Sequence, residues 1–300
     1  MTGPADRRDL RGTWGAPEIA TPWPDGARLA VSFVVNVEEG AELSISDGDE
    51  RNESVYEIRE EVEGGGDPCM ESHFAYGPRR GYGRIVSAFA AHGVRATFST
   101  CGRAAQRLPW LMRDAVARGH EISCHGWRWE RHAGMTPDIE AKIIAETHAT
   151  IATVSGQPPV GWHTRSAPSE RTRALLVEHG GFIYDSDCYD DDQPRIEPVG
   201  DRDHVILPYA FDTNDMRFSP GGGFVRPEDF TRYVSGAFDR LYDEGGQGAR
   251  MLSVGLHLRV IGRPGRIGGL DALLSHMTSR SGVWFATRAQ IAQCWKEVAQ

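Results

Sequence analysis

The sequence lacks any pairing pattern among its cysteines. The five cysteines are widely spaced and never form a C-x-x-C pair. They are Cys69, Cys101, Cys124, Cys188 and Cys294. A disulfide framework or a zinc ribbon needs an even, paired set. Both classes are therefore excluded, and a reducing compartment is favoured.

The chain also lacks long apolar runs and an excess of positive charge. No apolar run approaches the ~20 residues that span a bilayer, and no apolar segment follows the N-terminal basic residues as in a secretory signal. We therefore expect a cytoplasmic protein with no membrane partner. With 33 Lys+Arg against 42 Asp+Glu the net charge is -9, which argues against nucleic-acid binding. The acids concentrate between Glu38 and Glu63.

The 300 residues contain 40% hydrophobic residues, enough for a sizeable core. Residues 1–26, rich in Pro and Gly, are predicted to form an extended arm, and residues 27–300 a single domain. About seven strand-then-helix units follow one another in that domain without a linker. They include a near-continuously apolar strand at 29–35, a helix at 137–156 capped by Thr136, a helix at 227–244 and a strand at 283–285.

This order predicts an α/β fold with a parallel sheet, closed most simply as a barrel. An open doubly wound sheet is the alternative, but no G-x-G-x-x-G follows the first strand. Thr287 and Gln290 form a capping-box pattern for a terminal helix. The segment 41–76 is far longer than a βα loop of ~2–6 residues, which is typical of lids, binding loops and contact arms.

Active sites of parallel barrels lie at the carboxyl ends of the strands, so polar residues there are candidates. At the end of the first strand, Asn36 and Glu38 point to one side and Glu39 to the other. A solvated acidic turn is the structural alternative. His125 follows another strand, with Trp127 and Trp129 as a pocket wall.

His257 and Arg259 share one face at the end of a later strand. Two histidines and a carboxylate on separate strand ends indicate a site. The chain has no G-x-S-x-G elbow, no H-E-x-x-H helix and no P-loop. We interpret His120, His148, His163 and His179 as structural.

Four stretches of the chain resemble the motifs of the polysaccharide deacetylase (NodB-homology) family, and more narrowly its allantoinase and cyclic imide hydrolase branch. They are Val35-Asn-Val-Glu-Glu-Gly, Gly119-His-Glu-Ile-Ser-Cys-His-Gly-Trp-Arg-Trp, Tyr184-Asp-Ser-Asp and Gly255-Leu-His-Leu-Arg-Val-Ile-Gly-Arg-Pro. The resemblance covers nearly the whole chain. It implies an irregular (β/α)7 barrel that hydrolyses carbon–nitrogen bonds other than peptide bonds.

The chain departs from the metal site that this resemblance implies. Deacetylases use an Asp base, an Asp ligand and a His-x-x-x-His pair, but Trp129 stands four residues after His125. Asn36 or Glu38 falls at the base position, with Glu38 or Glu39 at the ligand position. His257 matches the late histidine that serves as a general acid. We expect no cofactor, although a weakly bound zinc held by Glu38, His125 and His257 stays open.

We therefore predict catalytic roles for Glu38, His125, His257 and Asn36. Glu38 would activate water, the histidines would donate protons or stabilise an oxyanion, and Asn36 would orient water or substrate. Trp127, Trp129, Arg165 and Arg259 are predicted to bind substrate, since a planar guanidinium suits a ureide or imide edge. Arg263 is a further candidate.

Three functions are compatible with these residues. The first is hydrolysis of a cyclic amide such as allantoin, another ureide or an imide. The second is release of acetate from an N-acetylated sugar, and the third is a non-catalytic barrel that binds a metabolite or a carbohydrate. The arm and the acidic segment offer contact surface, and the resembling branch is commonly oligomeric, so we also predict a homo-oligomer.

Overall fold

The computed structural model describes residues 11–12, 18–55, 58, 60–165 and 167–298. Most of the predicted arm at 1–26 lies outside these residues. Its described part packs on the body: Trp23 is buried against Trp284 and Trp295, with ring centroids 5.8 and 5.7 Å away. The Trp23 Nε1 donates to the carbonyl of Arg250 at 3.0 Å.

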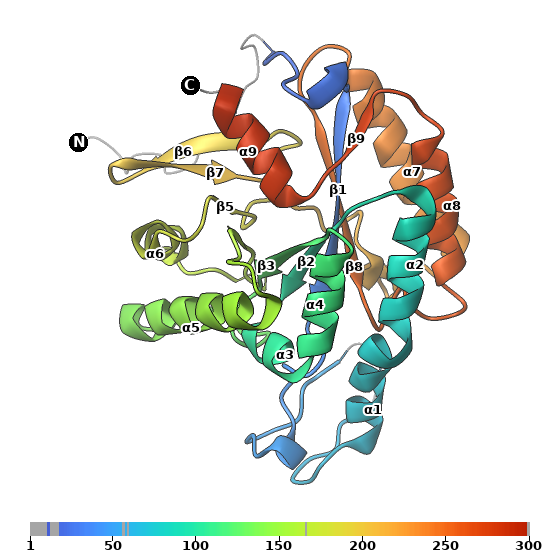
Figure 1. The fold of residues 1–300 in the computed structure, drawn as a ribbon. Coiled ribbons are helices and arrows are strands. Elements are labelled where there is room, and N and C mark those ends of the chain that lie inside the picture. Colours follow the sequence, from blue (N-terminus) through green and yellow to red (C-terminus); the bar gives the residue numbers. More distant parts are fainter. Residues whose placement is uncertain (1–10, 13–17, 56–57, 59, 166, 299–300) are drawn as a thin grey trace, which may run out of the picture.

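A single curled sheet forms the centre of the fold, with its helices on the outside (Figure 1). Its strands are β1 (Leu29–Val37), β2 (Thr97–Thr100), β3 (Glu121–Cys124), β4 (Gly161–Trp162), β5 (Tyr184–Asp185), β6 (Arg195–Val199), β7 (Arg202–Ile206), β8 (Met251–His257) and β9 (Val283–Phe285). The strand order is β6-β7-β5-β4-β3-β2-β1-β8, and β9 also pairs with β1. Every pair is parallel except β6 with β7.

This architecture confirms the predicted α/β barrel of the deacetylase type, in its irregular form. In the described chain the sheet ends at β6 on one side and β8 on the other and does not close, and an isolated bridge joins Asn214, in the stretch after β7, to Gly255 of β8. β1 is buried along all nine residues, as its near-continuous apolar sequence predicts.

Nine α-helices are described. They are α1 (Pro68–Tyr76), α2 (Tyr82–His92), α3 (Gly102–Arg107), α4 (Pro109–Ala117), α5 (Pro137–Ser155), α6 (Thr172–His179), α7 (Pro227–Glu244), α8 (Ile267–Thr278) and α9 (Arg288–Val298), with a π-turn at Gly77–Gly81 joining α1 to α2. None of the described helices is long and apolar enough to cross a membrane.

Two helix starts test the predicted caps. Gln290 Oε1 accepts from the Thr287 backbone N–H at 3.0 Å, and Thr287 Oγ1 accepts from the Gln290 N–H at 3.3 Å, so the capping box before α9 is confirmed. Thr136 stands at the N-cap of α5 with Pro137 at the helix start, as predicted, but the Thr136 side chain makes no capping hydrogen bond. Pro137 at the first position has no N–H to satisfy, which lowers the need for a cap.

Arg288, the first residue of α9, is fully buried and joins β8 to the residues that follow β5 and β7. Its Nε donates to Ser186 Oγ at 2.8 Å and its Nη1 to Ser253 Oγ at 3.2 Å. Its Nη2 donates to the carbonyls of Leu207 and Pro208 at 2.5 and 2.9 Å. Four acceptors thus surround one buried cation, one within β8 and three just beyond β5 and β7.

The long segment between β1 and α1 lies at the lower end of the view, opposite α9 (Figure 1). It includes a short 3-10 turn at Ile45–Asp47, whose Asp47 pairs with Arg107 of α3 at 2.7 Å. Asn52 Nδ2 donates to the carbonyls of Val62 and Gly65 at 2.9 and 2.8 Å, which ties the segment to itself. The acidic segment is therefore folded against the barrel end.

Candidate active site

A cavity of about 590 Å³ opens at the carboxyl ends of the strands. Asn36, Glu38, His125 and His257, which we call the cavity floor, line its base and are 2 to 3% exposed. Arg51, Arg131 and Phe211, which we call the cavity rim, line its exposed edge. The structure thus brings together all four residues predicted as catalytic.

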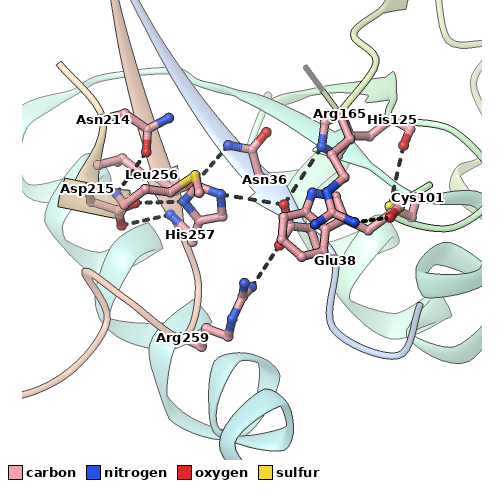
Figure 2. A network of polar contacts seen from close by, with 12 residues as sticks. Asn36, Glu38, Cys101, His125, Arg165, Asn214, Asp215, Leu256, His257 and Arg259 are labelled. Carbon is pink, nitrogen blue, oxygen red and sulfur yellow. Dashed lines mark hydrogen bonds and ion pairs between the residues drawn. The ribbon is translucent and has the colours of Figure 1, made fainter. Parts of the chain in front are cut away.

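The two oxygens of Glu38 have different surroundings (Figure 2). Oε2 accepts from Arg259 Nη1 at 2.9 Å. Oε1 lies 3.5 Å from His257 Nε2 and 3.8 Å from His125 Nε2. The Arg259 guanidinium therefore balances the negative charge at Oε2, whereas Oε1 lies between the two imidazole rings.

Arg259 decides the charge state of the two neighbouring carboxylates. Burial alone raises the pKa of Glu38, but Arg259, and after it His257 and His125, hold that pKa well below its usual value. Glu39 does not line the cavity, and its Oε1 is 3.5 Å from Arg259 Nη1. Burial raises the pKa of Glu39 to about 7 despite this contact. Glu38 is thus the ionised carboxylate of the site.

His257 is held as a cation. Asp215, at the start of the 3-10 turn Asp215–Phe218, places Oδ1 2.7 Å from His257 Nδ1, and its Oδ2 accepts backbone N–H groups of His257 and Ile261 at 2.8 and 3.0 Å. Burial lowers the pKa of His257, but Asp215 and Glu38 together raise it to about 10. The Nε2 that faces Glu38 therefore carries a hydrogen at neutral pH.

His125 has the opposite arrangement. Its Nδ1 lies 2.6 Å from the backbone carbonyl of His163. A carbonyl only accepts, so Nδ1 carries a hydrogen, and whenever the ring is neutral Nε2 presents its lone pair to the cavity. The His163 ring stacks on that of His125 at 5.1 Å and also lines the cavity. Burial, with His125 next, lowers the pKa of His163 well below its usual value, so this second ring is neutral.

Asn36 presents a buried acceptor. Its Nδ2 donates to the Leu256 carbonyl at 3.3 Å and to Tyr209 Oη at 3.1 Å. The carbonyl can only accept, which fixes the amide orientation. Asn36 Oδ1 has no hydrogen-bond partner among the described residues. Such an acceptor suits an N–H group of a bound molecule.

The predicted substrate-binding residues are placed differently from one another. Arg165 and Trp129 both line the cavity, with the guanidinium 3.3 Å above the indole centroid. Arg259 lies behind Glu38 rather than in the cavity lining, and Trp127 packs against Gly102 of α3. Arg263 lies over the ring of Tyr76 at 3.7 Å.

The donor set does not fit a zinc ion. Within the described part of the chain, no three His, Cys, Asp or Glu side chains converge to hold a metal. A guanidinium already balances Glu38 from 2.9 Å, and the protonated Nε2 of His257 has no lone pair to give. A catalytic zinc takes three deprotonated protein ligands.

Sequence reasoning missed Asp215, Tyr209 and His163 as parts of the site. His163 follows the two-residue strand β4, and the other two lie in or after the irregular stretch 207–214. The position of His163 after a strand was a usable signal. Tyr209 and Asp215 had none, because neither the two-residue period of a strand nor the 3.6-residue period of a helix runs through 207–214.

Comparison with known proteins agrees with this fold. The model of the family described as polysaccharide deacetylase matches residues 63–180. A Schizosaccharomyces pombe protein assigned as a polysaccharide deacetylase is 38% identical over 97% of this chain and 97% of its own length. The chain belongs to the polysaccharide deacetylase family and is a hydrolase acting on carbon–nitrogen bonds.

Two solved structures resemble the chain to the same degree. PuuE allantoinase is 40% identical, with a TM-score of 0.91 over 97% of both chains. A Pseudomonas aeruginosa protein assigned as a polysaccharide deacetylase is also 40% identical, with a TM-score of 0.91 over 97% of this chain and 98% of its own. A peptidoglycan deacetylase of Helicobacter pylori is 27% identical over 71% of this chain and 82% of its own.

Proposed function

We propose that this chain opens the ring of a cyclic amide, such as a ureide, a hydantoin or an imide, with water and without a metal. The observation that carries the proposal is the pair of imidazoles with opposite hydrogen placement beside Glu38 Oε1. One supplies a lone pair and the other an N–H cation, which is the combination that hydrolysis of an amide requires.

The attacking water would lie between Glu38 Oε1 and His125 Nε2, which are 3.8 Å apart, close enough for one water to contact both. Since Glu38 is a weak base, the water proton passes to His125 Nε2 while the water oxygen bonds to the ring carbonyl carbon. Glu38 then balances the imidazolium that forms. The negative charge that develops on the carbonyl oxygen is stabilised by the N–H of His257.

Ring opening follows when the carbon–nitrogen bond breaks and the ring nitrogen takes the proton from His125. The product is an open chain with one carboxyl group and one amide or ureido nitrogen. Asn36 Oδ1 accepts from a substrate N–H, a donor that ureides, hydantoins and imides all carry. His257 keeps its proton throughout, since Asp215 and Glu38 hold it.

The likeness to PuuE allantoinase supports a ring substrate, and the donor set supports a reaction without Lewis-acid help. A strained or activated ring needs less electrophilic assistance than an acetamide. Release of acetate from an N-acetylated sugar is the second candidate, favoured by the relatives assigned as deacetylases.

Metal analysis of the purified protein together with turnover assays separates the two. We expect far less than one metal ion per chain, with turnover of allantoin or succinimide that survives chelation. Stoichiometric zinc with chelator-sensitive release of acetate from an N-acetylated sugar oligomer would overturn the proposal.

A further inference from the structure

The cavity is larger than the ring that the proposed reaction needs. Its 590 Å³ lies within the ~300–1,000 Å³ of pockets that enclose drug-sized ligands. A five-membered ring with two carbonyl oxygens fills a small part of this volume. The substrate therefore has room for a substituent that extends from the floor toward the rim.

The charge of the lining is opposite to that of the whole chain. Four cations, Arg51, Arg131, Arg165 and His257, face two carboxylates, Glu38 and Glu53, although the chain has a net charge of -9. A concave site of one sign concentrates ligands of the other sign.

Most of these charges already have partners. His257 lies between Asp215 and Glu38, and Arg165 lies on the Trp129 ring and donates to the Trp129 carbonyl at 2.9 Å. Glu53, 7% exposed, accepts from the Leu43 backbone N–H at 3.4 Å. These groups are held by the protein itself.

Arg51 and Arg131 differ from the other cations of the lining. Both are exposed, and no ion pair joins either guanidinium to a carboxylate of the described chain. Among the described residues, Arg51 makes one long hydrogen bond of 3.4 Å from Nη1 to the Asn52 carbonyl. They come from two unrelated segments, the acidic segment after β1 and the loop between β3 and α5.

We propose that the substrate is a cyclic amide bearing an anionic substituent, and that Arg51 and Arg131 bind this anion at the rim while the ring lies on the floor. The inference rests on the proposed ring opening and makes the two arginines specificity-determining residues. It also gives the acidic segment a role, since that segment carries Arg51 into the cavity. The carboxylate of Glu53, on the same segment, would repel an anion placed deeper in the cavity.

The test uses two ligands of nearly equal shape, hydantoin-5-acetate and its neutral amide, hydantoin-5-acetamide. We would measure kcat/KM for both with the full chain. We would also titrate both into the Glu38→Gln variant, so that affinity is read without turnover. We expect a preference for the anion of roughly tenfold, falling with added salt because the rim is exposed.

Arg51→Gln and Arg131→Gln should each reduce this preference by roughly two- to fivefold, through KM, and the double variant should abolish it. Arg131→Lys should keep most of it, since the charge remains. Arg280→Gln is the matched control: it removes one exposed arginine beyond α8, which pairs with Asp239 at 3.4 Å, and should leave the preference unchanged.

The outcomes separate the two proposals. Equal kcat/KM and equal affinity for acid and amide, or a preference untouched in the double variant, would overturn the anionic substituent and leave ring opening standing. If neither ring is opened while the acid still binds more tightly than the amide, ring opening fails and the anion site stands.

Discussion

The floor and the rim of the cavity are built in different ways. Every floor residue lies at or just beyond a strand end, is at most 3% exposed and contacts a residue from another strand. The rim residues lie on irregular segments, and Phe211 is 49% exposed. Under the proposed function, the sheet positions the reacting groups and the loops determine which substrate binds, as in barrels generally.

The strongest test of this division is Glu38→Gln. If the floor performs the reaction, kcat should fall on the order of 10³-fold, because the group that holds the water and balances His125 is lost. Binding of hydantoin-5-acetamide should persist. Steady-state kinetics and calorimetry measure the two effects separately.

Glu39→Gln is the control for that change, since Glu39 also contacts Arg259 but does not line the cavity. Its effect on kcat should be far smaller. Full activity in Glu38→Gln would refute the mechanism, and unchanged affinity in a chain that never turns over any ring would favour the non-catalytic binding barrel.

Asp215→Asn tests the floor through a residue outside the lining. Without the carboxylate, His257 loses its main stabilising charge, so kcat should drop by between ~10- and 100-fold, the range typical of groups that orient a functional histidine. The alkaline limb of the pH–kcat profile should also move to lower pH. A loss of kcat with an unmoved pH profile would mean that Asp215 acts only as a structural residue.

The pH dependence of folding stability follows from the Asp215–His257 pair. The pKa of His257 is about 10 in the folded chain against an ordinary 6.5, so its contribution to stability is fully present below about 6.5. That contribution is lost as the pH rises through about 10. Thermal unfolding between pH 6 and 10.5 should show a falling midpoint, and His257→Gln should flatten the alkaline part of this curve.

The rim should give the smallest effects. Phe211 stacks on Tyr189 with ring centroids 4.1 Å apart, and both rings are partly exposed. Phe211→Ala should raise KM by roughly two- to fivefold and leave kcat and the unfolding midpoint nearly unchanged. A large fall in kcat would show that the rim takes part in the chemistry, and would contradict the division of roles between floor and rim.

The sequence predicted the floor better than the rim for a physical reason. Alternation along β1 places Asn36 and Glu38 on one side, and parallel strands bring His125 and His257 to the same end. No such period governs Arg51, Arg131 or the stretch before Asp215. Their positions depend on how irregular segments fold against the barrel.

The helices and strands also differ in how well the sequence predicts them. The helix predicted at 227–244 and the strand at 283–285 agree with α7 and β9 to the residue. Helix α8 was not predicted, because Gly268 and Gly269 near its start disfavour a helix. Gly269 is needed there, since a Cβ would lie 2.7 Å from the Pro227 carbonyl oxygen of α7. Packing overrides local preference at this helix crossing.

Arg288 sets an order of events during synthesis. The floor depends on β8 and on the stretch after β7, and the guanidinium that joins these elements follows every described strand along the chain. A nascent chain can build β1 to β4 early, but the buried acceptors beside β5, β7 and β8 meet this cation only after every described strand has been made. A chain that ends before α9 would have all the described strands but would lack the cation that joins β8 to the residues after β5 and β7.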